Sequence, residues 1–340
     1  MSTGTLRVGI AGLGRLGRRH AETLARHTPG CSLVAACSPV DAERDMARHD
    51  LQVPRVYADF DRFVADPELD AVVLATPTPL HADQTIAALR RGMHVFVEKP
   101  LALNVEDCER VERVAAEHPG QVAMVGFVRR FDPSYLHARQ AIADGAIGKP
   151  FLVRSQTCDP LDATGAFIRF APSSGGIFMD CSVHDIDVAR WMLGNPRATR
   201  VYASGMVAVH EALRDIGDVD NGLAMIEFEG GAQAMLYASR TFAHGHETHS
   251  EIIGTAGKLL VGHGAARDRV VLSDVHGVRH QAVADFFERF GEAFGREMQA
   301  FVSSCRGEQA PALSLSDATE ATRIGLAITR SWRSGQAQAV

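Results

Sequence analysis

The sequence predicts an α/β protein with two domains: an N-terminal doubly wound parallel sheet and a C-terminal α/β domain with a large, mostly antiparallel open sheet. Up to about residue 125, short runs that are apolar throughout alternate with segments of helical length, as expected for parallel strands buried on both faces. Beyond that point, short β-rich runs follow one another at glycine turns, which is typical of antiparallel sheets. The length of 340 residues fits two domains, since one domain commonly holds ~100–200 residues.

In the N-terminal part, strands and helices are predicted to alternate. Strands are expected at residues 6–11, 32–37, 71–75, 94–97 and 121–125, and helices at 15–27, 41–49, 80–91 and 104–118. Two of these helices carry start signals. Asn104 stands three residues before Asp107 as an N-cap, and Asp83 lies in the first turn of its helix.

The C-terminal part has a different pattern. Seven β-rich runs, expected to form one antiparallel sheet, lie at residues 149–157, 199–206, 223–229, 232–240, 250–253, 258–261 and 269–273. Helices are expected at 134–144, 183–192, 284–305 and 316–334. We therefore predict a cofactor-binding domain over residues 1–124 and a substrate-binding and oligomerisation domain over 125–340, whose last helix can pack back on the first domain.

Composition excludes several classes of partner. With 35 Lys+Arg against 41 Asp+Glu the formal charge is −6, so the chain lacks the basic excess that binds nucleic acid or an anionic membrane. The six cysteines form no CxxC pair and are expected to be reduced thiols. The N-terminus lacks the charged and apolar regions of a leader, and no apolar run approaches the ~20 residues of a membrane span. A cytoplasmic protein is expected.

A glycine pattern follows the first predicted strand. Its residues, spaced as G-x-G-x-x-G, are Gly12, Gly14, Arg15, Leu16 and Gly17. Gly12 permits a tight turn, Gly14 lets the backbone approach a pyrophosphate, and Gly17 allows the helix to pack closely on the strand. Between a strand and a helix, the pattern predicts a Rossmann-type dinucleotide-binding domain rather than a structural glycine turn.

The second strand is followed by a departure from that fingerprint. About 20 residues past the glycines, an Asp or Glu is expected to bind the ribose 2′-hydroxyl. This chain has a neutral Ser38 there, with Asp41 and Arg44 further on. A hydroxyl in place of a carboxylate removes the repulsion against a 2′-phosphate, but no Arg directly follows Ser38. The cofactor is therefore NAD or NADP, unless another segment sets the preference.

Reactive side chains stand at two further places. Lys99 follows the fourth strand, at the carboxyl edge where open α/β sheets bind ligands; a lone lysine there is more often a solvated cation. Asp180 and His184 are four residues apart on a predicted helix, so they share a face. The carboxylate would orient the imidazole, which makes His184 a competent general base near neutral pH. Alone, such a pair is more often a surface helix pair.

In combination these motifs resemble a known family. The matching blocks lie at residues 12–17, 75–81, 98–102, 126–133, 175–187 and 251–257. In this order, over nearly the whole chain, they are similar to the Gfo/Idh/MocA oxidoreductases, and the blocks at 126–133 and 175–180 resemble the inositol-type members. The resemblance implies a nicotinamide cofactor and hydride transfer from a hydroxyl-bearing carbon.

The resemblance also implies residue roles. Lys99 would hydrogen-bond the reacting hydroxyl and Asp180, while His184 would take the hydroxyl proton. A cis peptide would precede Pro100. Further substrate contacts would come from Arg129, Thr157 and Asp159, and the nicotinamide side would be lined by Thr76, Pro77, His81 and Glu98.

Near the substrate the chain departs from the inositol-type pattern. Where tyrosines are common in those enzymes, it has His244, His246 and Phe294, which we expect to contact the substrate. Together with His249 the histidines also suggest a metal site. No cysteine or paired carboxylate completes such a set, and no metal is expected.

The expected function is NAD(P)-dependent oxidation of a secondary hydroxyl of a cyclic polyol, with myo-inositol to 2-keto-myo-inositol as the leading case. Alternatives are a scyllo-inositol or aldose 1-dehydrogenase of the same family, or a non-catalytic dinucleotide-binding co-regulator. A sensor has no physical need for Lys99, Asp180 and His184 together, which argues against the last alternative. The expected partners are a small cyclitol or sugar and further copies of the chain, as a dimer or homotetramer through the C-terminal sheet, with no nucleic acid and no membrane.

Overall fold

The computed structural model describes residues 4–162, 164–262 and 264–340. The chain divides into two compact units, Met1–Val128 with Glu292–Thr319, and Arg129–Gly291 with Glu320–Val340. The segment Glu292–Thr319 thus joins the first unit, whereas the predicted division kept everything after residue 124 together. Residues 1–3, on which the expectation about a leader partly depended, lie outside the described residues.

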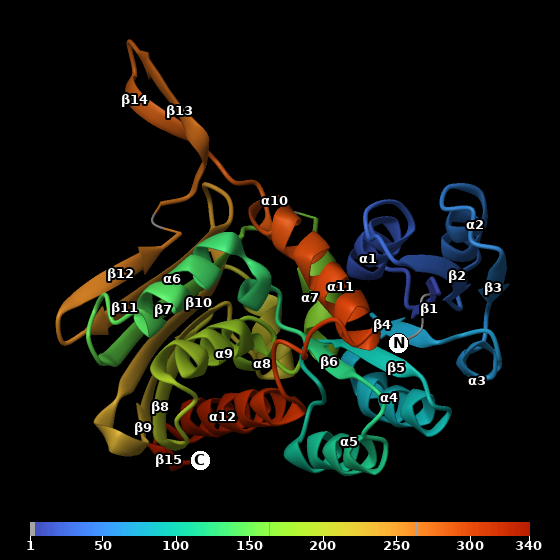
Figure 1. Ribbon diagram of the computed structural model, residues 1–340. Helices are drawn as coiled ribbons and strands as arrows, with labels where there is room; N and C mark the ends of the chain where they lie inside the picture. The colour runs from blue at the N-terminus through green and yellow to red at the C-terminus, as the bar shows by residue number, and fades with distance from the viewer. Residues whose placement is uncertain (1–3, 163, 263) are drawn as a thin grey trace. The chain divides into compact units, whose positions relative to one another are not determined.

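The first unit is a doubly wound α/β domain, as predicted. Its six strands are all parallel, in the order β3-β2-β1-β4-β5-β6, with α1 and α2 on one side of the sheet and α4 and α5 on the other (Figure 1). The strands are β1 Leu6–Ala11, β2 Cys31–Cys37, β3 Arg55–Tyr57, β4 Ala71–Leu74, β5 His94–Glu98 and β6 Ala123–Gly126. The helices are α1 Arg15–Arg26, α2 Asp41–His49, α3 Phe60–Val64, α4 His81–Arg90, α5 Val105–Glu117 and α11 Gly291–Cys305, with a 3-10 turn η1 at Thr78–Leu80.

Local chemistry explains most of these elements. The central strand β4 is buried along its whole length, which accounts for its unbroken apolar sequence. The Asn104 side chain accepts a hydrogen bond from the Asp107 N–H and starts α5, so the predicted N-cap is confirmed. The short β3 and α3 were not predicted, because β3 spans three half-buried residues and α3 five, too few for a periodic signal.

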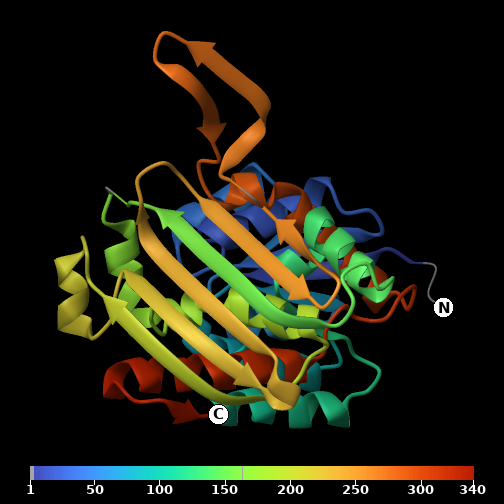
Figure 2. The same ribbon diagram turned by 90° about the vertical axis from the view of Figure 1, so that its left-hand side faces the viewer.

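The second unit is built on a seven-stranded sheet in the order β12-β11-β7-β10-β9-β8-β15. Neighbouring strands are antiparallel except for the central pair β7 and β10, which is parallel. One face of this sheet is open, with α9 and α12 behind it (Figure 2). The strands are β7 Pro150–Pro160, β8 Ala198–Met206, β9 Asn221–Phe228, β10 Gln233–Phe242, β11 Glu247–Gly254, β12 Gly257–Val261 and β15 Gln338–Ala339.

One predicted strand does not belong to that sheet. The run 269–273 falls within β13 Ala266–Asp274, which pairs only with β14 Gly277–Ala282 as a separate hairpin. Val275 and Val278 are 95% and 73% exposed, so the hairpin has no buried face. It projects from the second unit (Figures 1 and 2).

The remaining helices carry much of the site. They are α6 Pro133–Ala143, α7 Ala166–Phe170, α8 Ile177–Asp180, α9 Ser182–Leu193, α10 Phe286–Arg289 and α12 Leu315–Ser334. The single helix expected at 284–305 is two helices, because Asp285 caps α10 and Phe290 leaves the helical conformation before α11 begins. The first turn of α12 belongs to the first unit, where Thr319 bonds Glu112. No described helix is long and apolar enough to cross a membrane.

Candidate active site

The glycine loop sits between β1 and α1 as predicted. Gly12 has a φ of +85°, and a side chain there would meet the Ala75 carbonyl oxygen at 2.4 Å. A Cβ on Gly17 would lie 1.9 Å from the Gly12 oxygen, so this glycine is needed for close packing. In contrast, a Cβ on Gly14 would meet nothing within 4 Å. The backbone before α1 therefore leaves open space at the helix N-terminus, where a phosphate group fits.

A cavity of about 310 Å³ extends from this loop to α2. Its lining residues are Leu13, Gly14, Arg15, Arg18, Ala42, Glu43 and Met46. At the end of β2, Ser38 donates a hydrogen bond of 2.5 Å to Glu43. A carboxylate from α2 thus stands in the region where the fingerprint places its Asp or Glu. These residues fit a dinucleotide at the loop: open backbone for the pyrophosphate, and a carboxylate for a ribose.

Arg44 does not offer a free cation beside Ser38. One Nη atom donates to the Ser38 carbonyl oxygen at 2.6 Å, and the other pairs with Asp41. The guanidinium is therefore already engaged within the β2–α2 turn.

Lys99 follows the end of β5, and the peptide bond to Pro100 is cis. The Glu98 carboxylate accepts a hydrogen bond of 3.1 Å from the Lys99 backbone N–H. Nearby, the buried His81 ring lies 2.9 Å from the Pro100 carbonyl oxygen and 2.8 Å from that of Thr76. Burial lowers the pKa of His81, despite these two acceptors.

The residues predicted to line the nicotinamide side lie close to this segment. The Thr76 hydroxyl donates to Gln84 at 2.6 Å, and Pro77 directly precedes the turn η1. Both His81 nitrogens face backbone carbonyls, and a neutral ring, which has one N–H, donates to one of the two and so helps to hold this segment in place.

In the second unit, Asp180 and His184 occupy consecutive helices. Asp180 ends α8, and His184 lies in the first turn of α9, with Cys181 between them. The predicted single helix is therefore interrupted at this point. The His184 N–H still donates to the Cys181 carbonyl oxygen at 3.3 Å, so the two side chains remain about one turn apart along the chain.

Asp180 belongs to a charged network centred on Arg240. The Arg240 guanidinium pairs with Asp180 and lies 3.4 Å from an Asp159 oxygen. It also stacks on Phe167, with 4.1 Å between Cζ and the ring centroid. Asp159 in turn accepts from His246 Nδ1 at 3.1 Å. Asp159 and Arg240 come together because the parallel strands β7 and β10 end at the same edge of the sheet.

These contacts shift the titration of both partners. Burial alone would raise the pKa of Asp159, but the hydrogen bond from His246 and the charge of Arg240 outweigh it and lower that pKa. Burial opposes the charge on Arg240 as well. The neighbouring Cys181, Asp180 and Asp159 more than compensate and raise the pKa of Arg240. Asp159 and Arg240 therefore both stay charged at neutral pH.

Arg129 and Thr157, predicted to face the substrate, form a separate buried network. Arg129 donates to Asp185 at 2.7 Å and bonds Thr157, whose hydroxyl donates to Asp185 at 2.5 Å. Arg129 is 2% exposed and Thr157 5%. These three side chains therefore satisfy one another in the core, at the residue that directly follows His184.

The three residues at which the chain departs from the inositol-type pattern lie in different surroundings from one another. His244 and His246 lie in the turn between β10 and β11, not on a strand; His244 is exposed, and His246 is buried between Asp159 and Thr248. Phe294 is 3% exposed within the first unit, where its ring contacts that of His20 at 5.7 Å. That core position does not support the predicted substrate contact of Phe294.

Three residues that take part in these hydrogen bonds and ion pairs were not predicted from the sequence. Glu43 stands in the first turn of α2, Asp185 directly follows His184, and Arg240 lies near the end of a β-rich run. Only Asp185 had a sequence signal, its place inside the matching block 175–187. Glu43 and Arg240 are recognisable only from the side chains that the fold brings to them.

A phosphate-accepting glycine loop on a parallel sheet, followed by a mostly antiparallel unit with an acid, a histidine and an arginine near its strand ends, is the architecture of a two-domain dinucleotide-dependent oxidoreductase. Comparisons with known proteins agree. Residues 6–127 match the family described as "Oxidoreductase family, NAD-binding Rossmann fold", and residues 135–260 match the "GFO/IDH/MocA C-terminal domain". The chain belongs to the Gfo/Idh/MocA family of oxidoreductases, as the motifs predicted.

Individual relatives match along almost their whole length. Scyllo-inositol 2-dehydrogenase (NAD(+)) of Bacillus subtilis is 37% identical, covering 97% of this chain and 95% of that protein. Myo-inositol 2-dehydrogenase of Thermotoga maritima is 32% identical, covering 96% of each. The crystal structure of scyllo-inositol dehydrogenase from Lactobacillus casei with bound NAD(H) and scyllo-inositol has a TM-score of 0.95 at 37% identity, covering 98% of this chain and 99% of that one.

Proposed function

We propose that this oxidoreductase is an NAD-dependent cyclitol dehydrogenase that oxidises the 2-hydroxyl of myo-inositol to give 2-keto-myo-inositol. The observation that carries the proposal is the ion-paired group of Asp159, Asp180 and Arg240, in which Asp180 lies about one helical turn before His184 in the chain. Fixed charges of both signs can hydrogen-bond several hydroxyls of a polyol at once. Relatives named as inositol dehydrogenases, which match over 96–97% of the chain, support the same substrate class.

Three side chains are assigned to the chemistry. Lys99 donates a hydrogen bond to the reacting hydroxyl, and His184 takes the hydroxyl proton as general base. Asp180, whose charge is balanced by Arg240, orients the polar groups around that proton. A bound nicotinamide supplies the hydride acceptor. The protein's contribution is therefore mainly positioning and proton removal.

NAD is proposed over NADP. The Glu43 carboxylate, in the cavity wall beside the glycine loop, favours a ribose 2′-hydroxyl and repels a 2′-phosphate. Arg44, the cation that could attract that phosphate, is engaged by Ser38 and Asp41.

Scyllo-inositol is the second candidate, because the scyllo-inositol enzymes named above are 37% identical against 32% for the myo-inositol enzyme. The two inositols differ only in configuration at C2, so oxidation there gives the same ketone. The reverse reaction distinguishes them. Purified protein with NADH and 2-keto-myo-inositol should form myo-inositol, identified by chromatography; scyllo-inositol as the product would favour the second candidate.

The forward reaction tests the proposal itself. Purified protein with NAD is mixed with myo-inositol, scyllo-inositol or glucose, and the absorbance of reduced nicotinamide is followed. Oxidation of a cyclitol is the expected result. Bound dinucleotide without turnover of any substrate would contradict the proposal and favour a co-regulator.

We further propose a cytoplasmic homotetramer assembled through the C-terminal unit. The open face of its sheet carries a row of exposed apolar side chains across β8, β9 and β10, made of Tyr202, Met225 and Met235. Such a patch is typical of a self-association surface.

A further inference from the structure

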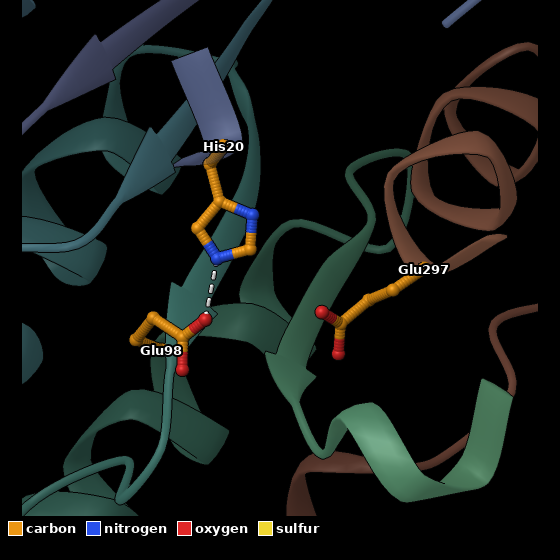
Figure 3. Close-up of side chains that lie close together, drawn as sticks. All are labelled: His20, Glu98 and Glu297. Atoms are coloured by element: carbon orange, nitrogen blue, oxygen red, sulfur yellow. Dashed lines mark hydrogen bonds and ion pairs between the residues drawn. The ribbon is translucent and has the colours of Figure 1, made fainter. Parts of the chain in front are cut away.

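A buried cluster of three titratable side chains lies in the first unit. It consists of His20 on α1, Glu98 at the end of β5 and Glu297 on α11, which are 0%, 5% and 0% exposed. One nitrogen or oxygen from each lies within 4.8 Å of the others. Figure 3 shows the Glu297 carboxylate extending from α11 toward the His20–Glu98 pair.

Both oxygens of Glu98 take part in hydrogen bonds. His20 Nε2 lies 2.6 Å from Oε1, and the Lys99 backbone N–H donates to Oε2 at 3.1 Å. With His20 donating from Nε2, Glu98 accepts on both oxygens, as a carboxylate can. Glu98 therefore links the first helix after the glycine loop to the segment that carries Lys99.

Glu297 presents the opposite situation. Neither of its oxygens has a hydrogen-bond partner among the described residues, and the side chain is completely buried. Ionisation would place a second negative charge beside Glu98 in a dry site, which is costly. Burial, and then the charge of Glu98, raise the pKa of Glu297 well above its usual range.

The side chain cannot escape to water, because α11 is packed on both neighbouring elements. Phe294 contacts His20 of α1 at 5.7 Å between ring centroids, and Phe301 contacts Phe96 of β5 at 5.7 Å. The titratable groups that face Glu297 are therefore His20 and Glu98, with Lys99 next in the chain.

Either a proton or a metal ion could relieve this arrangement, and the geometry favours the proton. Zinc holds nitrogen and oxygen ligands at ~2.0–2.2 Å, so two ligand atoms on one ion lie roughly 3 Å or more apart. His20 Nε2 and Glu98 Oε1, at 2.6 Å, are bonded directly to each other. A cation has no room between them, whereas a proton on Glu297 removes the second negative charge without displacing either residue.

We propose that Glu297 stays protonated at neutral pH, which keeps a second negative charge away from the neighbouring Glu98, and that it is thereby a positioning residue for Lys99. The inference rests on the role proposed for Lys99 above. While Glu297 is neutral, Glu98 holds both His20 and the Lys99 N–H. Ionised Glu297 repels Glu98 and loosens the strand end that carries the lysine.

The protonation state can be tested on the full-length protein without any turnover. At neutral pH the infrared difference spectrum of wild type minus Glu297→Gln should contain the carbonyl band of a protonated carboxylic acid. The matched control is Glu292→Gln, the same change on the exposed side of α11, which should lose no such band. Absence of the band from wild type, or one equivalent of bound transition metal in the purified protein, would overturn the proposal.

The pH dependence of stability is a second readout. The folded chain keeps a proton on Glu297 that the unfolded chain releases above pH ~4.3, so this residue makes stability fall as the pH rises, until Glu297 ionises in the fold. As the pH is raised from about 5 to about 8, the urea midpoint of wild type should therefore fall relative to that of Glu297→Gln. Parallel curves for the two proteins would refute a protonated Glu297.

Kinetics test the link to Lys99. Glu297→Ala should lower kcat about tenfold or more, and Glu297→Gln, which imitates the neutral acid, should restore most of it. Wild type should lose kcat at alkaline pH as Glu297 ionises, and the Gln variant should lack that limb. Identical pH profiles, or no rescue by Gln, would overturn the positioning role. If no cyclitol is oxidised at all but the infrared band is present, the proposed function fails and the protonated cluster stands.

Discussion

The hydroxyl of Ser38, at the end of β2, donates a 2.5 Å hydrogen bond to the Glu43 carboxylate in the first turn of α2. The strand end itself is neutral, but a carboxylate reaches it from the following helix. The carboxylate belongs to a residue five positions beyond the place where the fingerprint has its acidic residue.

The first prediction concerns cofactor preference. Glu43→Gln removes the charge that repels a 2′-phosphate, so the ratio of kcat/KM for NADP over NAD should rise about tenfold, which corresponds to ~1.4 kcal/mol. Asp45→Asn, an exposed change on the same helix outside the cavity, is the control and should leave the ratio unchanged. An unaltered ratio in Glu43→Gln would mean that another segment sets the preference.

The second prediction concerns the proposed chemistry. Lys99→Ala and His184→Ala should each lower kcat by about two or more orders of magnitude, while NAD still binds. Steady-state rates and a fluorescence titration with NAD check the two parts. Lys258→Ala, which removes an exposed lysine paired with Glu251, is the control. Near-normal rates in either site variant would refute its assigned role.

The third prediction concerns Arg240. Arg240→Met leaves Asp159 and Asp180 without their counter-charge, and loss of one partner of a buried ion pair costs ~3–5 kcal/mol. Turnover should fall with it. Arg200→Met, which breaks an exposed pair with Glu227 on the same sheet, should cost less than ~1 kcal/mol. Urea unfolding measures the loss of stability in both variants. Equal small losses would show that the ion pairs of Arg240 do not stabilise the site.

The pH dependence of that variant follows from Asp159. Because the pKa of Asp159 lies below its usual value, its pairing stabilises the fold above pH ~3.9 and is lost as the pH falls through the lower, folded pKa. Without Arg240 the pKa of Asp159 should rise toward or above its unfolded value, so Asp159 no longer adds to acid destabilisation and the stability cost of Arg240→Met should shrink as the pH falls. Urea midpoints of both proteins across the acid range test this, and a cost that stays constant or grows as the pH falls would contradict it.

The fourth prediction concerns assembly. Met225→Lys combined with Met235→Lys places two charges at directly paired positions of β9 and β10 on the open sheet face. The assembly should dissociate into smaller species, measured by light scattering after size exclusion. Leu136→Lys, at an exposed apolar position on α6, is the control. An unchanged mass for the double variant would place the interface elsewhere.

Features that depend on residues close together in the chain were predicted, and features that depend on residues far apart in the chain were not. Helix α2 matches the predicted bounds, and Asn104 caps α5 as expected, because both signals lie within a few neighbouring residues. The break at Phe290 and the separate β13–β14 hairpin were missed, since periodicity does not show which strand or helix continues into its neighbour. Arg129 and Thr157 were expected to face substrate, but Asp185 engages both in the core.

By itself, the sequence determined a parallel α/β part followed by a mostly antiparallel sheet, a glycine loop that opens the first helix, and the placement of Lys99 just after the fourth long strand. Each of these depends on residues adjacent in the chain and on the steric limits of the backbone. The tertiary structure alone decided that Glu43 returns to Ser38, that Arg240 joins residues 60 and 81 positions away, and that Glu297 reaches Glu98. Strand register and helix packing determine which of these residues become neighbours. The electrostatic interactions between those neighbours then determine the protonation states of the buried groups.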